Sequence, residues 1–525
     1  MTAPAALAST GVLHAGGPAV WVALAACVGA LGPSGIRWLR VAQREHYLGG
    51  SVPRFALRWW TVGWPNLVLG AVGLAGLVAS VWWPLAALAT AAAVAGGPLG
   101  LSLRGRTSQL AWTRRLRTLA AVWVVLQALI VVVGVIVGLP AVVAAAGTLA
   151  VPLVMDLACR VMAPVERRLV QPYVRSAAKR LEAVHPTVVA ITGSYGKTST
   201  KRHVADLVAG TRTVVATPAS FNNRAGLARA VNEHLAEGTE VFVAEMGVYG
   251  PGEIAEMSRW CRPDVAVITA IGPVHLERMG TEEQILEAKA EITELAHTVV
   301  LNVDDHRLAG LADRLDGVNP AKEVVRCSAL DSDADVAVEK ADDGRLTLYV
   351  GGSPAGPPVP APLGLQPSNL ACAAAVALRL GVPATDVAQR LGRLAPAPNR
   401  LAAGTAASGV LVIDDTFNSN PVGARAALEV LAGTGALRRA VVTPGMVELG
   451  RRQAEENRDW AAAASRAATD LVIVGQTNRR ALIAGSAGLV PVLVPDRAAA
   501  VDWVRSELGP GDAVLYENDL PDHYP

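Results

Sequence analysis

The first 155 residues of this 525-residue chain contain one acidic residue, Glu45, and no lysine. They also hold ten arginines, which fall into two clusters, and nine of the chain's twelve tryptophans. A soluble domain needs far more charge on its surface, whereas a helical region inside a bilayer has this composition. Across the whole chain, 47 basic and 45 acidic residues nearly balance, which argues against a nucleic-acid partner. The composition therefore predicts an α-helical transmembrane region followed by soluble domains.

Five apolar stretches in this region are each close to the roughly 20 residues needed to cross the hydrocarbon core. They are residues 18–36, 61–81, 83–102, 118–138 and 140–159. The basic loops follow the first, third and fifth stretches, so the positive-inside rule predicts an outside N-terminus and cytoplasmic soluble domains. An interfacial aromatic belt is indicated by Trp59, Trp60, Trp64, Trp82 and Trp83. We expect a multi-pass protein of the cytoplasmic (inner) membrane, with membrane lipid as a partner.

The segment after this region combines a strand, a glycine loop and a helix. β-Branched residues at 188–192 lead into Gly193-Ser-Tyr-Gly196, and Lys197 and Thr198 precede a helical stretch at 201–208. Backbone N–H groups at such a helix start hold phosphate oxygens, the lysine neutralises terminal phosphates and the threonine hydroxyl can ligate Mg²⁺. Two residues separate the glycines, where the strict Walker A pattern has four. The flanking strand and helix still favour ATP binding by Gly193, Ser194, Gly196, Lys197, Thr198 and Ser199.

Strand-like and helix-like stretches alternate after this loop, which predicts a doubly wound parallel sheet. Its strand candidates are residues 188–192, 213–216, 241–244, 265–269 and 299–302, with a hairpin at 336–352. A linker near 393–398 precedes a second α/β unit with strand candidates at 410–413, 440–443, 471–475 and 513–516. We expect a five-span transmembrane region over 1–160, a basic juxtamembrane helix over 161–185, a central ATPase domain over 186–395 and a C-terminal domain over 396–525.

Other classes of function are less well supported by the sequence. The five cysteines have no C-x-x-C pair or framework spacing, which indicates neither a zinc site nor a disulfide scaffold. The only charged residue inside the apolar stretches is Asp156, near the end of the fifth, whereas transporters usually carry ionisable groups deeper in the membrane. An ATP-using enzyme is favoured over a transporter, and a non-catalytic membrane scaffold for envelope-synthesis enzymes stays open as an alternative.

Eight motifs between about 185 and 525 resemble, in order and spacing, those of the Mur ligases, which join a carboxylate to an amine through an acyl phosphate. They are Thr192-Gly-Ser-Tyr-Gly-Lys-Thr-Ser199, Thr217-Pro-Ala-Ser-Phe-Asn-Asn223, Ala244-Glu-Met-Gly247, Ile271-Gly-Pro-Val-His-Leu-Glu277, Glu287-Ala-Lys-Ala-Glu-Ile292, Leu301-Asn-Val-Asp-Asp305, Asp414-Asp-Thr-Phe-Asn-Ser-Asn-Pro421 and Thr443-Pro-Gly-Met-Val-Glu-Leu-Gly450. The resemblance is strongest to the branch that adds D-Ala-D-Ala in peptidoglycan synthesis (MurF), and within it to a membrane-attached, MurF-like group. It implies a P-loop, doubly wound central domain and a Rossmann-like C-terminal domain.

The resemblance also implies roles for individual residues. Mg²⁺ would be held by Thr198, Glu245 and His275, and by Lys289, because several members carry a carbamylated lysine at that position. The expected catalytic residues are Lys197, His275 and Lys289. By the same resemblance, Asn302 and Asp305 would contact the adenine side of ATP. Arg400 and Asp415 resemble residues that reach ATP when the domains close, and Asn222 and Asn223 would belong to a substrate-side loop.

One departure bears on the substrate. Apolar stretches occupy the region where soluble members of the branch carry a UDP-binding domain. The sequence therefore indicates a membrane-anchored, ATP-dependent acid–amino-acid ligase of peptidoglycan or related envelope-polymer synthesis. Its substrates would be a cell-wall-type carboxylate, UDP-linked or lipid-linked, and an amino acid or dipeptide amine. A poly-γ-glutamate or capsule-type ligase stays open as a second alternative.

Overall fold

The computed structural model describes residues 17–105, 110–218, 221–274, 276–318, 322–362, 364–395, 401–417, 419–521 and 523–525. The chain forms two compact units. A helical unit comprises Met1–Leu169 together with Leu520–Pro525, and an α/β unit comprises Val170–Asp519. The last residues of the chain therefore belong to the same unit as the first.

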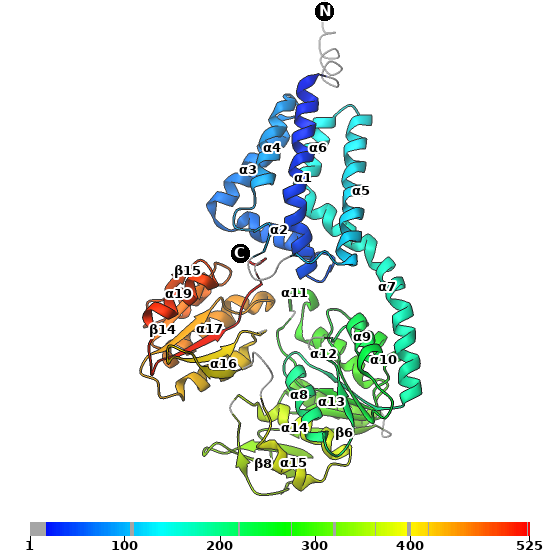
Figure 1. Ribbon diagram of the computed structural model, residues 1–525, viewed down its shortest axis with the longest axis vertical. Coiled ribbons are helices and arrows are strands. Elements are labelled where there is room, and N and C mark those ends of the chain that lie inside the picture. The colour runs from blue at the N-terminus through cyan, green and yellow to red at the C-terminus, as the bar shows by residue number, and fades with distance from the viewer. Residues whose placement is uncertain are drawn as a thin grey trace, which may run out of the picture. The chain divides into compact units, whose positions relative to one another are not determined.

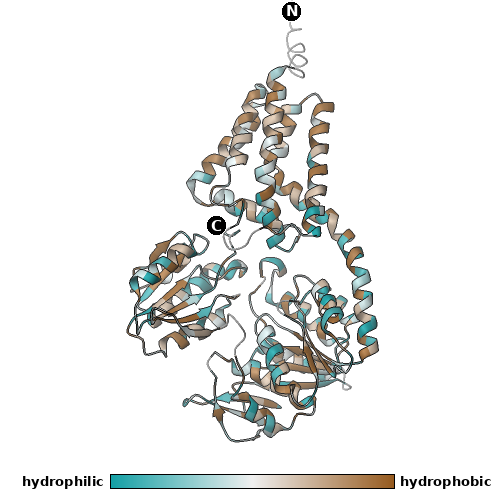
Figure 2. Ribbon diagram, viewed as in Figure 1, coloured by the Kyte–Doolittle hydropathy of each residue, from teal (hydrophilic) through white to brown (hydrophobic). Residues whose placement is uncertain are grey.

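Helices make up most of the described helical unit (Figure 1). They are α1 (Pro18–Arg44), α2 (Ser51–Thr61), α3 (Gly63–Ala79), η1 (Pro84–Ala86), α4 (Ala87–Gly96), α5 (Arg114–Ile136), α6 (Pro140–Leu149) and the first part of α7 (Val151–Val184). Small apolar residues let α1 pack closely on α4 and α6, among them Cys27, Ala91 and Ala145. Figure 2 shows that apolar residues predominate along these helices. Trp64, Trp82 and Trp83 remain exposed, as residues of an aromatic belt would.

The number of separate membrane-crossing helices differs from the five predicted. Among the described residues, α1 and α5 are long and apolar enough to cross a membrane, and the number rises to four if the bent pairs α2–α3 and α6–α7 are one span each. The stretch at 83–102 forms only the helical segment Pro84–Gly96, which at 1.5 Å per residue covers about 20 Å of a roughly 30 Å core. The length of an apolar stretch does not reveal where a helix bends. The bends here are 110° between α2 and α3 and 72° between α6 and α7. Membrane insertion itself stays a prediction.

The second half of the fifth apolar stretch and the basic juxtamembrane helix are one element. Helix α7 runs without a break from Val151 to Val184, past the expected boundary at 160. Within the α/β unit its last turns bury Val174, Ala177 and Leu181 in a hydrophobic core. The basic segment is thus an integral, packed helix of that unit at its C-terminal end.

A ten-stranded sheet forms the first part of the α/β unit (Figure 1). Its strands are β1 (Thr187–Thr192), β2 (Val214–Ala216), β3 (Val241–Glu245), β4 (Val265–Ile268), β5 (Thr298–Asn302), β6 (Glu323–Ser328), β7 (Val336–Lys340), β8 (Arg345–Val350), β9 (Ser353–Pro354) and β10 (Val359–Pro360). The order is β10-β8-β7-β6-β5-β4-β1-β3-β2, with β9 on β8, and β1 to β7 are parallel. Because β1 lies between β3 and β4, the winding reverses there, and ligands bind at the carboxyl ends of strands at such a reversal.

Helices cover both faces of this sheet. One face carries α8 (Lys197–Val208), α14 (Pro367–Arg379) and α15 (Ala384–Leu391). The other carries the end of α7 with α9 (Arg224–His234), α10 (Glu253–Trp260), α12 (Glu282–Ala290) and α13 (His306–Val318). The short elements α11 (Leu276–Met279) and η2 (Glu291–Thr293) lie in the connections around α12. The apolar runs of β1, β3 and β4 are buried on both sides, as expected for central parallel strands.

A six-stranded sheet follows, in the order β11-β12-β16-β13-β14-β15. Its strands are β11 (Ala402–Thr405), β12 (Leu411–Asp415), β13 (Arg439–Thr443), β14 (Asp470–Val474), β15 (Val492–Val494) and β16 (Ala513–Glu517). All neighbours are parallel except β11, which is antiparallel to β12. The accompanying helices are α16 (Pro421–Ala432), η3 (Gly450–Arg452), α17 (Gln453–Ala467), α18 (Arg479–Gly485) and α19 (Arg497–Glu507). The carboxyl ends of β12, β16 and β13 are adjacent, which brings Asp415, Glu517 and Thr443 to one edge.

Candidate functional site

The glycine loop at 193–196 lies at the carboxyl end of β1, where the winding of the large sheet reverses. Gly196 is the N-cap residue of α8 with φ +79°, and a Cβ there would lie 2.1 Å from Oδ1 of Asn369. Only glycine fits both constraints. No side-chain hydrogen bond caps the first turn of α8 among the described residues, so its N–H groups are available to an anion. Lys197 Nζ donates to the carbonyl of Gly193 at 2.7 Å and lies over the loop.

Glu245, the last residue of β3, faces α8 and is 2 % exposed. One carboxylate oxygen accepts from Lys201 Nζ at 2.9 Å and from Thr198 Oγ1 at 3.1 Å. The other accepts from Asn222 Nδ2 at 3.1 Å. The β1–β3 register, which pairs Ile191 with Glu245, places this carboxylate beside the start of α8. The predicted residues Thr198, Asn222 and Glu245 are therefore brought together.

The surroundings of Glu245 keep its carboxylate ionised. Burial by itself would raise its pKa, but the nearby Lys201 and Lys197 ammonium groups and the hydrogen bonds from Lys201 and Asn222 lower the pKa below its usual value. The site therefore contains a buried, negatively charged carboxylate that lies beside the N-terminus of α8.

Lys289, on α12, is a buried lysine with 3 % of its surface exposed. Burial, followed by repulsion from Lys197, lowers its pKa well below the usual lysine value. The positive charge of Lys197 therefore acts on Lys289, and both burial and this repulsion favour the neutral amine form of Lys289.

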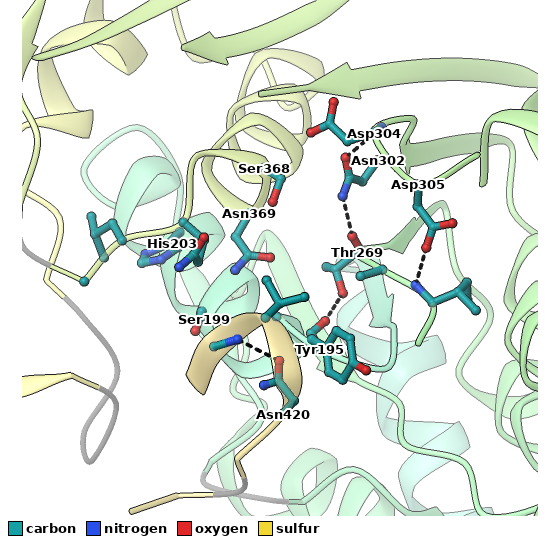
Figure 3. Close-up of a pocket in the computed structure, with 18 of the residues that line it drawn as sticks. Tyr195, Ser199, His203, Thr269, Asn302, Asp304, Asp305, Ser368, Asn369 and Asn420 are labelled. Carbon is teal, nitrogen blue, oxygen red and sulfur yellow. Dashed lines mark hydrogen bonds between the residues drawn. The ribbon is translucent and has the colours of Figure 1, made fainter. Parts of the chain in front are cut away.

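A cavity of about 420 Å³ opens beside the glycine loop, and residues from both sheets of the α/β unit line it. Figure 3 shows Tyr195, Ser199 and His203 on one side and Asn302, Asp304 and Asp305 on another. The six-stranded sheet and its loops contribute Leu401, Asp415, Phe417, Ser419 and Asn420. The volume is in the range of small-molecule sites.

Asn302 and Asp305, predicted on the adenine side, both line this cavity and also shape it. Asn302 Nδ2 donates to the carbonyl of Thr269 at 3.0 Å, and Asp305 Oδ2 accepts from the N–H of Ile271 at 2.9 Å (Figure 3). These bonds fix the β4 loop against the β5 loop. Asp305 also accepts from the N–H of Arg307 at 3.1 Å at the start of α13, so it has a structural role there.

Asp415 lies at the end of β12, is buried, and accepts from the N–H of Leu401 at 3.3 Å. Its neighbour across the sheet is Glu517, to which Ser419 and Thr443 donate hydrogen bonds. Burial, together with the charge of Asp415, outweighs these bonds and raises the pKa of Glu517 to about 7. Two carboxyl groups therefore hold the loops of the six-stranded sheet that face the cavity.

The remaining predicted residues are distributed differently. His275 and Arg400 lie outside the described residues. Asn223 Oδ1 accepts from the N–H of Gly226 at 2.9 Å and caps α9, away from the carboxylate that binds Asn222. Within the described part of the chain, no cluster of three or more His, Cys, Asp or Glu side chains forms a ready-made metal site.

Sequence reasoning missed four residues that the structure places at the site. Lys201 pairs with Glu245, and its spacing of one helical turn from Lys197 was an available signal. Asn369 closes over Gly196, and Glu517 supports the loops of the small sheet. His203 lines the cavity, 1 % exposed, and its Nδ1 has no hydrogen-bond partner among the described residues. For these three, the sequence offered no spacing that pointed to the cavity.

The fold agrees with that of known proteins. Residues 191–376 match the Mur ligase middle domain, and residues 399–516 match the Mur ligase glutamate ligase domain. The UDP-N-acetylmuramoyl-tripeptide–D-alanyl-D-alanine ligase of Mycobacterium leprae is 34 % identical over 376 residues, which cover 65 % of this chain and 72 % of that protein.

Solved structures give the same picture. The MurF structure from Acinetobacter baumannii aligns with a TM-score of 0.58 at 25 % identity, covering 67 % of this chain and 77 % of that one. MurF from Thermotoga maritima in complex with ADP aligns with a TM-score of 0.57 at 26 % identity, covering 67 % and 80 %.

A glycine loop at a sheet reversal, a buried carboxylate beside it and a cavity closed by a second α/β sheet define an ATP-dependent ligase. The chain belongs to the Mur ligase family, and it is similar to MurF, an enzyme of peptidoglycan synthesis.

Proposed function

We propose that this chain is a membrane-anchored, Mg²⁺- and ATP-dependent amide ligase of envelope-polymer synthesis. It joins a cell-wall-type carboxylate, presented at the inner leaflet, to an amino acid or dipeptide amine. The observation that carries the proposal is the ionised, buried Glu245 held by Thr198, Lys201 and Asn222 beside the glycine loop. A carboxylate that only stabilised the fold would not have to lie beside the N-terminus of α8.

The residues present fit Mg·ATP. The N–H groups of α8 and the Lys197 ammonium bind the phosphates, and the cavity lined by His203, Asn302 and Asp305 takes the adenosine. The hydroxyl of Thr198 and the carboxylate of Glu245 are hard oxygen donors, which Mg²⁺ prefers. Bound there, Mg²⁺ screens the repulsion between the substrate carboxylate and the γ-phosphate.

The chemistry has two steps. A substrate carboxylate oxygen attacks the γ-phosphorus, the bond to the β,γ-bridging oxygen breaks, and ADP leaves from the acyl phosphate. The amine nitrogen then attacks the acyl carbon, phosphate leaves with the electrons of the C–O bond, and the nitrogen loses a proton to give the amide. Lys197 stabilises negative charge on the transferred phosphoryl group, and Asp415, from the second sheet, closes the ATP site; Arg400 is proposed to contact ATP as well.

Lys289 carries a carbamate in the active enzyme. Its depressed pKa favours the neutral amine, whose nitrogen bonds to the carbon of CO₂ and loses a proton. The product is an anion that supplies an oxygen ligand, together with His275. Carbon-13-labelled bicarbonate should therefore give a carbamate resonance in the wild-type protein. The resonance should persist in Lys179→Gln, an exposed lysine of α7, and its presence in Lys289→Gln would contradict the assignment.

The ligase proposal is tested with the full chain in lipid nanodiscs. A UDP-linked muramoyl tripeptide and its lipid-linked counterpart are supplied with D-Ala-D-Ala and Mg·ATP. We expect ADP release and an amide product detected by mass spectrometry, with the lipid-linked carboxylate used faster because the apolar helices hold the enzyme at its source. Equal use of both would show that the helices are only an anchor.

A matched pair of variants controls this assay. Lys197→Ala should abolish ADP formation, whereas Lys179→Ala should leave it unchanged. If the wild-type protein formed no ADP with any of the carboxylates, the alternative of a non-catalytic membrane scaffold would be favoured instead.

Membrane topology is tested separately. Site-specific reporters should place residue 5 outside, and residues 40–58, residues 102–117 and everything after 160 in the cytoplasm. An outside signal from residues 102–117 would contradict the proposed orientation.

A further inference from the structure

Two residues near residue 525, His523 and Tyr524, are buried in the helical unit. Leu520–Pro525 group with Met1–Leu169, and the side chains of His523 and Tyr524 are 2 % and 8 % exposed. Chain termini are usually poorly ordered unless specific contacts hold them. The extent of burial therefore points to a binding site for the tail.

A carboxylate and two aromatic residues of the helical unit hold His523. Its Nε2 lies 2.9 Å from Oε1 of Glu45, just after the end of α1, and both side chains are buried. Its backbone carbonyl accepts from Nε1 of Trp59 on α2 at 2.8 Å. The ring of Phe55, also on α2, lies 4.7 Å from that of His523.

Tyr524 completes the contact. Its ring meets that of Phe55 edge-on at 4.9 Å, and the guanidinium of Arg58 lies 5.3 Å from the Phe55 centroid and 6.0 Å from the Tyr524 centroid. Edge-to-face rings attract one another, and a cation is attracted to the ring beneath it, through the quadrupole of the ring, in addition to the effect of area burial. Trp59, predicted as part of an interfacial belt, is instead 4 % exposed and binds the tail.

The composition of the region makes the pairing selective. Glu45 is the only acidic residue before Asp156, and it is 4 % exposed. A buried carboxylate is costly without a hydrogen-bonding partner, and His523 supplies one. Loss of the tail would leave Glu45 without this partner and would uncover Phe55 and Trp59.

We propose that the end of α1 and helix α2 form a docking site for the chain's own C-terminal tail, with Glu45, Phe55 and Trp59 as the recognition residues. The docked tail is a second covalent tie between the helical unit and the α/β unit, in addition to α7. The tie is short, because five residues separate Glu517 at the end of β16 from His523, and an extended chain spans at most about 3.6 Å per residue.

Cross-linking tests the docking directly. In the double variant Arg58→Cys/Pro525→Cys, which keeps the recognition residues and His523, a short bis-maleimide should link the two positions, because Arg58 lies 6.0 Å from the ring of the neighbouring Tyr524, and should shift the migration of the full-length chain on a denaturing gel. The five native cysteines are buried, so they contribute little background under native conditions. Val22→Cys/Pro525→Cys serves as control, because Val22 is exposed and lies near the opposite end of α1 in the same helical unit. Linkage of the first pair no greater than that of the control would overturn the proposal.

Hydrogen exchange tests the recognition residues. We expect amides of residues 51–61 to exchange at least tenfold faster in His523→Ala and in Glu45→Gln, and the double variant to exchange no faster than either single one. His234→Ala, an exposed histidine of α9, should leave these amides unchanged. Nucleotide binding should be retained in all variants, which separates undocking from unfolding. Unchanged exchange in both single variants would show that the tail contact does not stabilise α2.

Discussion

Replacement of Lys201 by methionine tests the central electrostatic feature of the site. The Lys201–Glu245 pair is 2.9 Å long, with side chains 7 % and 3 % exposed. Removal of one partner from a buried ion pair costs about 3–5 kcal/mol, because the other charge is left uncompensated. Glu245 keeps its bonds from Thr198 and Asn222, and methionine nearly conserves the volume, so we expect about 3 kcal/mol.

The pH dependence of this loss has a definite sign. In the wild type the pKa of Glu245 is depressed below 4.5, so the carboxylate stabilises the fold at neutral pH and this contribution is lost only as pH falls through the depressed pKa. Without Lys201, burial dominates and the pKa of Glu245 should rise. The variant is then destabilised progressively as pH rises from about 5 to 8, and the difference from wild type is smallest at the acid end.

Hydrogen exchange of peptides from β3 and α8, corrected for intrinsic rates, measures this in the full chain between pH 5 and 8. Lys179→Met, at an exposed position of α7, is the matched control. Added Mg·ADP should restore part of the protection, because a cation again faces Glu245. A loss below about 1 kcal/mol, or one that is independent of pH, would refute the view that Lys201 compensates a buried charge.

Three further predictions concern the glycine loop and the second sheet. Lys197→Ala should eliminate ADP formation, measured by a coupled assay, while circular dichroism remains unchanged. Gly196→Ala should weaken ATP binding at least tenfold by calorimetric titration, and Asn369→Ser should partly restore it, because φ +79° and the Asn369 contact both exclude a side chain. Because the pKa of Glu517 is raised from 4.5 to about 7 in the folded protein, burial of this group should reduce stability as pH rises from about 4.5 to 7, by roughly 3 kcal/mol at most, and Glu517→Gln should abolish that slope in thermal melts.

Much of the α/β unit could be predicted from sequence, because buried parallel strands are continuous apolar runs. The strand candidates at 188–192, 241–244 and 440–443 coincide with β1, β3 and β13 to within a residue or two. Strands β6, β11 and β15 were missed. β6 is interrupted by charge, β11 is a short exposed Ala/Gly segment, and both owe their conformation to neighbouring strands.

The parts of the site that depend on local sequence could be predicted, whereas the parts that depend on the register between strands could not. The strand–glycine loop–helix order located Gly196 and Lys197, although α8 begins at Lys197 and not at 201. Lys201 and Glu245 are 44 positions apart in the sequence. They meet because β1 and β3 pair in a particular parallel register, which no local sequence pattern encodes. Likewise, counting apolar residues located the helical region but could not place the bends at Val62 and Ala150.

The buried tail has a consequence for how the protein is made. Glu45 and His523 are separated by 478 positions, so the docking site leaves the ribosome long before its occupant does. Helix α2 stays uncovered until residue 523 has been synthesised, and any chain that stops short of it lacks this contact. A bulky group attached beside Tyr524 would compete with docking, because the segment around it is buried.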